Sequence, residues 1–366
     1  MAEVVSGCFR LSAVGVDFFR RGLMILMFAG SFATPLKAVN IIYTIDPLYG
    51  VSAEALSAFE EAASMWESRL VDPVTVSIKI GAYDFGPGYS NIIGGASPTY
   101  HDISYSQYRA AYEADAGSDA DFAVLATLSS GPSYQRYVNA VYPGWNVFID
   151  SNRYISMHDN VRLAGANAKA LGFSLGPADA ADAMINFNTA VGFDYDRTDG
   201  ISPGMMDFVG VAAHEIGHAL GFTSIVNDVD SGQNFMTVLP SMPMDFIRYS
   251  AQSEQWAVHD VSIESSYATQ RRYIKIGDTN IPMSTGLVNG DGYQASHFLN
   301  DVTAGGVLGL MDPNIALGET LNISDYDLLV FDAIGWNLAV PEPSTCCIVI
   351  SASIVMLLRR KRCVLN

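Results

Sequence analysis

Apolar positions along the chain predict strands and helices in alternation from about residue 41 to residue 336. Residues 41–45 form a short apolar run typical of a strand, and residues 74–80 alternate Val or Ile with polar residues, as in a half-buried strand. Between the two runs, Ser52 can cap a helix. The apolar positions of this helix recur three and four residues apart, at Leu56, Phe59, Ala63, Trp66 and Leu70.

The middle of the chain gives weaker signals. Glycine clusters at 86–88 and 94–95 predict loops. Residues 96–180 contain several alanine-rich stretches that could be helical, but no dominant period. Residues 184–188 form another strand-like run. The pattern predicts one domain that mixes helices and strands and has no internal repeats.

Two helices in the second half of the chain are clearer. One is expected from about Asp207 to Leu220, after an acidic turn at 194–200. The other begins at Ser324, where Asp327 three residues on completes a weak capping box, and it ends near residues 335–336.

The charge of the chain limits its partners. The formal net charge is -18, and seven of the 20 basic residues lie before residue 34 or after residue 340, so the body between is more acidic still. Such a body repels phosphate backbones and anionic headgroups, so we expect no nucleic-acid partner and no membrane-surface binding by the body. Acidic loops could hold structural Ca²⁺ at residues 194–199 or 227–230, although a solvated acidic loop is the simpler interpretation.

The cysteines exclude several chemistries. All four lie at the ends, at Cys8, Cys346, Cys347 and Cys363. The body therefore has no disulfide framework, no thiolate zinc site, no cysteine nucleophile and no cysteine-bearing propeptide that could silence a metal.

The N-terminal end has the features of a secretory signal. Arg20 and Arg21 precede an apolar run at 22–33, and Ser31 and Ala33 supply small residues at the positions that a signal peptidase recognises. Residues 1–33 are therefore predicted to be a signal peptide cleaved after Ala33, which leaves residues 34–340 as the folded domain.

The C-terminal end has three parts in order. Pro-Glu-Pro-Ser at 341–344 is followed by a mostly apolar run at 346–358 and by basic residues at 359–362. This arrangement resembles a PEP-CTERM sorting signal. The resemblance implies that an exosortase-like enzyme processes residues 341–366 in the envelope of a Gram-negative bacterium, and that the chain meets the membrane only through this segment. A plain tail anchor would explain the apolar run and the basic cluster but not Pro-Glu-Pro.

The candidate chemistry lies on the helix predicted at 207–220. His214 and His218 are four residues apart and therefore project from one helix face, where two imidazoles can bind one zinc ion. Glu215 is one position round the helix, close enough to act as a base on a zinc-activated water without being a ligand. Burying two imidazoles and a carboxylate side by side is costly unless something coordinates them.

A third ligand is needed to complete a catalytic zinc site. The other histidines are His101, His158, His259 and His297. Asp228 is a rival, because a carboxylate seven residues past Gly221 can also complete such a site. We favour His297, because three neutral imidazoles leave the metal its full positive charge.

Together, His-Glu-x-x-His-x-x-Gly at 214–221, the later His297 and Leu-Met-Asp-Pro at 310–313 resemble the metzincin clan of zinc peptidases, and most closely its leishmanolysin-like branch. The resemblance implies an α+β zincin fold with a twisted, mixed five-stranded sheet, an active-site helix and a C-terminal helix. It also implies that peptide lies along an edge strand, and that Met311 forms a turn beneath the metal without being a ligand.

The sequence departs from the compact metzincin pattern at two positions. Ser224 stands where that pattern has a ligating His or Asp, and Pro313 stands where some branches have a ligating tyrosine. No residue is assigned to stabilise the oxyanion. Neither Ser130 nor Ser224 has neighbours that would make it a nucleophile.

The sequence therefore predicts an exported zinc-dependent endopeptidase, with Zn²⁺ held by His214, His218 and His297 and with Glu215 as general base. Its partner would be a protein or peptide substrate. Two alternatives stay open: a catalytically inactive surface or matrix binding protein with the same fold, and a zinc hydrolase that acts on something other than peptide.

Overall fold

The structure is a computed structural model, and it describes residues 38–89, 91–139, 154–177, 180–230, 239–251, 253, 261–264, 271–288 and 290–339. The signal peptide predicted at 1–33 and the sorting segment predicted at 341–366 lie outside these ranges. Within the described ranges, no helix has the length and apolar character needed to cross a bilayer.

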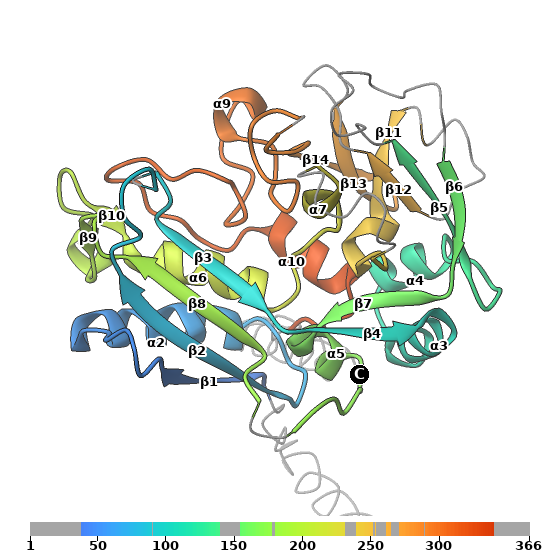
Figure 1. Ribbon diagram of the computed structural model, residues 1–366, viewed down its shortest axis with the longest axis horizontal. Coiled ribbons are helices and arrows are strands. Elements are labelled where there is room, and N and C mark those ends of the chain that lie inside the picture. The colour runs from blue at the N-terminus through green and yellow to red at the C-terminus, as the bar shows by residue number, and fades with distance from the viewer. Residues whose placement is uncertain are drawn as a thin grey trace, which may run out of the picture. The chain divides into compact units, whose positions relative to one another are not determined.

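A mixed, twisted sheet forms one side of the domain (Figure 1). Its order is β1 (Asn40–Ile45), β2 (Thr75–Tyr83), β8 (Ala183–Asn188) and β3 (Gly94–Pro98). β1, β2 and β8 run parallel, and β3 pairs antiparallel with β8. The strands predicted at 41–45, 74–80 and 184–188 are confirmed. The described residues give this sheet four strands, not the five that the resemblance implied.

Helix α2 (Ala53–Glu67) connects β1 to β2 and covers the sheet. The hydroxyl of Ser52 accepts a hydrogen bond from the Ala55 N–H, which confirms the predicted cap. The predicted apolar face is buried, apart from the partly exposed Leu56. α2 packs along helix α6 (Phe208–Ala219), and the indole of Trp66 donates to the Ala213 carbonyl at 2.8 Å.

The loop expected at residues 94–95 is wrong, because these glycines begin strand β3. Their backbone pairs with Phe187 and Asn186 of β8. A Cβ at Gly94 would lie 3.1 Å from the Glu215 Oε1 atom, so β3 comes unusually close to α6. Glycine at position 94 allows the strand to come this close to the helix. The sequence alone does not distinguish a glycine of this kind from one in a turn.

The region that showed no dominant period consists of short elements. They are β4 (Tyr100–Ser104), α3 (Tyr105–Asp115), α4 (Asp119–Leu125), β5 (Tyr134–Asn139), β6 (Tyr154–His158), β7 (Asn160–Ala164) and α5 (Gly165–Ala170). β4 pairs antiparallel with β7, and β5 lies between β12 (Val261–Glu264) and β6. Apart from α3, these elements have five to seven residues and are too short to display a helical or strand period clearly.

After β8 the chain first forms short elements at the end of the main sheet, and after α6 it builds the wall opposite that sheet (Figure 1). Between β8 and α10, the remaining short elements are β9 (Phe193–Asp194), η1 (Arg197–Asp199), β10 (Met206–Asp207), α7 (Val226–Asp230), η2 (Pro243–Ile247), β11 (Arg248–Ser250), β13 (Arg272–Ile276), β14 (Thr279–Met283) and α9 (Asp301–Ala304). The chain then enters α10 (Asp325–Ala333), where Ser324 and Asp327 form the predicted capping box.

Candidate metal centre

Helix α6 carries the two histidines of the predicted motif. Nearly all of its residues are buried, as expected for a helix between the sheet and the opposite wall. His214 and His218 lie one turn apart, and their Nε2 atoms are 3.1 Å from each other. The helix ends at Ala219 with Leu220 as its C-cap, and Gly221 follows with a φ of 116°, which lets the chain reverse.

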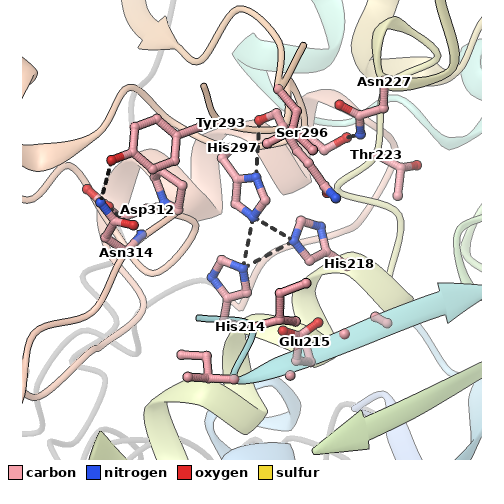
Figure 2. Close-up of a pocket in the computed structure, with 18 of the residues that line it drawn as sticks. His214, Glu215, His218, Thr223, Asn227, Tyr293, Ser296, His297, Asp312 and Asn314 are labelled. Carbon is pink, nitrogen blue, oxygen red and sulfur yellow. Dashed lines mark hydrogen bonds between the residues drawn. The ribbon is translucent and has the colours of Figure 1, made fainter. Parts of the chain in front are cut away.

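The third histidine comes from a segment far along the chain. His297 lies between β14 and α9, and its Nε2 atom is 3.1 Å from the Nε2 atoms of both His214 and His218. The three ring nitrogens thus form a triangle with equal sides (Figure 2). Among the described residues, these three are the group whose ligand atoms lie close enough together to hold a metal ion.

Backbone carbonyls fix the orientation of all three rings. The Nδ1 atom of His214 is 2.8 Å from the Leu310 oxygen, that of His218 is 2.8 Å from the Phe222 oxygen, and that of His297 is 3.1 Å from the Gln294 oxygen. A carbonyl can only accept, so each Nδ1 carries the proton and each Nε2 presents a lone pair to the other two rings.

Protonation of the rings does not stabilise the converging nitrogens, because the pKa values of all three histidines are lowered. Burial lowers the pKa of His214 to about 4. Burial, and then the neighbouring His214, lower the pKa of His218 to about 3, and the pKa of His297 lies well below its ordinary value for the same kind of reasons. Three neutral imidazoles with converging lone pairs repel one another unless a cation lies between them. The residues present therefore fit a divalent metal ion with nitrogen ligands.

Glu215 lies beside the histidines and against strand β3 (Figure 2). Its side chain is 6% exposed. Burial raises the pKa of Glu215 to about 8, and a hydrogen bond from the Ala96 backbone N–H opposes that rise. The carboxylate is thus in the place from which it can accept a proton, and a nearby metal cation would lower its pKa again.

Met311 and its neighbours pack against helix α6. Met311 is fully buried, and a Cβ at Gly217 would lie 2.6 Å from its sulfur atom. The Asp327 carboxylate accepts from the backbone N–H groups of Leu310 and Met311 at 2.7 and 3.1 Å. The sequence predicted Asp327 only as part of a helix cap. Its second role in holding the segment that orients His214 has no local sequence signal.

The three rings open onto a cleft of about 590 Å³. Strand β3 lines one side of the cleft, and residues 292–294, 296–297 and 312–315 line the other. Tyr89, Ile92 and Leu287 are exposed at its rim. None of the described lining residues is Lys or Arg, so the wall offers carboxylates, neutral polar groups and apolar surface.

The other candidates lie apart from the histidine triangle. Asp228, in α7, lines the cleft but is not in the group that can share a metal. The rings of His158 and Tyr134 are 5.7 Å apart and tilted by 32°, and burial lowers the pKa of His158 to about 4. His259 lies outside the described residues. The hydroxyl of Ser224 donates to the Asp245 carboxylate.

In the acidic turn before α6, the carboxylates of Asp194 and Asp196 accept hydrogen bonds from N–H groups of their own loop. Hydrogen bonds from the hydroxyls of Ser202 and Thr198, and then those from the N–H groups, lower the pKa of Asp194 and Asp196 respectively. Among the described residues, this loop does not form a group whose ligand atoms lie close enough together to hold a metal ion.

Comparisons with known proteins identify no relative. A scan of family models finds no match, and searches of curated proteins and of solved structures find no significant match.

Proposed function

We propose that this chain is a zinc-dependent endopeptidase with a metzincin-like fold. The observation that carries the proposal is the triangle of three unprotonated Nε2 atoms, 3.1 Å apart, beside a buried glutamate in an open cleft. His214, His218 and His297 would hold the metal, and three neutral imidazoles with one open position are a ligand set used by catalytic zinc. Zinc bound there would polarise the substrate carbonyl and acidify water.

Glu215 moves the proton. It follows His214 directly on α6, so the backbone that fixes the first ligand also fixes the base. As a carboxylate, it takes a proton from the attacking water and can then deliver that proton to the leaving nitrogen of the peptide. Its burial excludes bulk water, which would otherwise compete for the same proton.

The cleft suits an extended peptide. Strand β3 borders it and, within the described part of the sheet, pairs on one side only, with β8. An unpaired strand edge can hydrogen-bond to the backbone of a substrate regardless of its sequence. Nothing lies within 4 Å of the place that a Cβ would take at Gly95, so the strand leaves open space there for a substrate.

We also propose export, on the sequence features of the two ends. An exported, acidic hydrolase in a cell envelope or extracellular matrix fits the signal predicted at 1–33 and the sorting segment predicted at 341–366.

Purified, secreted protein tests the proposed function. We expect about one zinc per chain by metal analysis, hydrolysis of casein, and loss of that hydrolysis with a chelator that zinc then restores. A chain that binds zinc but cleaves no protein would favour the binding-protein alternative. A chain that binds no transition metal would overturn the metal centre itself.

A further inference from the structure

Residues that follow α6, in the connection to α7 and in α7 itself, hold the segment that carries His297. The hydroxyl of Ser296 accepts hydrogen bonds from the Ser224 N–H at 3.0 Å and from the Asn227 side-chain amide at 2.6 Å. The carbonyl oxygen of that amide accepts from the Ala295 N–H at 2.7 Å. Asn227 therefore binds the chain at both residues that precede His297, and Figure 2 shows it beside Ser296.

These bonds join two segments that lie far apart in the sequence. His297 is 79 positions beyond His218, whereas His214 and His218 are fixed relative to each other by one helical turn. A ligand brought back over such a distance must be fixed by contacts of its own, because the intervening chain supplies no local geometry. The Asn227 and Ser296 bonds span 68 to 72 positions and supply that fixation.

Residues 222–227, which run from the end of α6 into α7, position two ligands at once. The first of them, Phe222, accepts the Nδ1 hydrogen bond of His218 through its backbone oxygen. The last of them, Asn227, holds the segment whose Gln294 oxygen accepts from His297. Residues 222–227 are themselves anchored, because the buried Ser224 hydroxyl donates to the Asp245 carboxylate at 2.5 Å.

We infer that Asn227 and Ser296 are positioning residues for the third metal ligand, and that they set metal affinity by acting through His297. Asn227 and Ser296 bond to each other and to the backbone N–H groups of Ala295 and Ser224. These bonds do not involve the Nε2 atoms of the three histidines, which stay available to a metal ion. At position 224, where the compact pattern has a ligand, this chain instead has a residue that holds the ligand-bearing segment. The inference rests on the proposed metal site and adds the residues that assemble it.

Zinc affinity of the full chain, measured by competition with a chromophoric chelator, tests the inference. We expect Asn227→Ala and Ser296→Ala each to weaken zinc binding about 10- to 100-fold, the effect typical of outer-shell partners. In a His297→Ala background, Asn227→Ala should produce no further loss, because the residue through which it acts is gone. Cobalt-substituted Asn227→Ala should also show a visible spectrum shifted from wild type towards that of His297→Ala.

Asn314→Ala is the matched control. This exposed amide also lies in the cleft wall but bonds to the Tyr293 hydroxyl at 3.0 Å, on the other side of His297 (Figure 2). Its loss should leave zinc affinity unchanged. The melting temperature of each metal-free variant separates a lost fold from a lost ligand, and the less buried Asn227 gives the cleaner substitution.

The outcomes separate the inference from the proposed function. If the wild-type chain binds zinc and Asn227→Ala binds it with the same affinity, the positioning role alone is overturned. An affinity loss that persists in the His297→Ala background also overturns it, because the effect would then be a general one. A wild-type chain that binds no zinc overturns both the inference and the metal centre.

Discussion

The sulfur of Met311 lies so close to Gly217 that a Cβ at position 217 would be 2.6 Å from it. Gly217 sits on α6 between His214 and His218, so this contact connects the segment at 310–311 to the helix that carries two of the three rings. The same segment orients His214 through the Leu310 oxygen. Helix and segment therefore form one packed unit beneath the cleft, and any change in one must be accommodated by the other.

Gly217→Ala should destabilise the protein even though alanine favours helices. Overpacking costs about 1–3 kcal/mol, and the helix preference of alanine returns only about 1 kcal/mol. Urea denaturation measures the change. Combining it with Met311→Ala should give a smaller loss than the sum of the two single losses, because the truncated side chain makes room for the new methyl. Strictly additive losses would show that the two positions do not crowd each other.

Glu215→Gln should keep zinc and lose hydrolysis. The amide has nearly the same shape as the carboxyl group, so the three rings keep their positions, but it cannot accept the proton of the attacking water. We expect kcat/KM for a peptide substrate to fall by at least about 100-fold, with zinc content near that of wild type. Near-normal turnover would remove Glu215 from the role of base.

The same variant should change the pH dependence of stability in the metal-free protein. Burial raises the pKa of Glu215 to about 8, so the folded state keeps a proton that the unfolded state releases above its ordinary value of 4.5. Wild type should therefore lose stability relative to Glu215→Gln as the pH rises from about 4.5 to 8. The limit is about 1.4 kcal/mol per pH unit.

Denaturant unfolding of both proteins across this pH range, in the presence of a chelator, measures that difference. The histidines titrate alike in both proteins and cancel in the comparison. Added zinc should flatten the difference, because a nearby cation lowers the pKa of Glu215. A stability difference that does not vary with pH would show that the glutamate is ionised in the metal-free fold.

His297→Ala should remove most of the zinc affinity, whereas Asp228→Ala should keep both metal and activity. The ring of His297 is 3.1 Å from both other rings, and Asp228 is outside that group. Loss of a direct ligand should cost more than the roughly 10- to 100-fold typical of an outer-shell partner. Zinc content of the two purified variants decides between them, and the reverse result would move the third ligand to Asp228.

Mass spectrometry of the native, exported protein checks the two ends. We expect a start near Thr34 and no residues beyond the neighbourhood of 341–344, because a signal peptidase and an exosortase-like enzyme would remove the rest. Mature protein that still carries the basic cluster at 359–362 would contradict the sorting signal and favour a plain tail anchor.

Local features of the sequence determined the elements that carry the site. The helix predicted at 207–220, the Ser52 cap and the Ser324–Asp327 capping box all appear as expected. Each depends on residues a few positions apart, and helix periodicity and capping act over that range. The same local spacing sufficed to place His214, Glu215 and His218 on one helix.

Only the tertiary structure decided what lies against that helix. Gly94 was expected in a loop but belongs to a strand, because the glycine allows β3 to approach Glu215. The sequence offered Asn227 only as a possible calcium ligand and gave no role to Ser296, since their partners are 68 to 72 positions away and a single amide or hydroxyl is common on any surface. His297 could be named from the sequence only by comparing candidates and by resemblance. Its distance to the other two rings depends on the packing of the whole intervening chain, which no local pattern encodes.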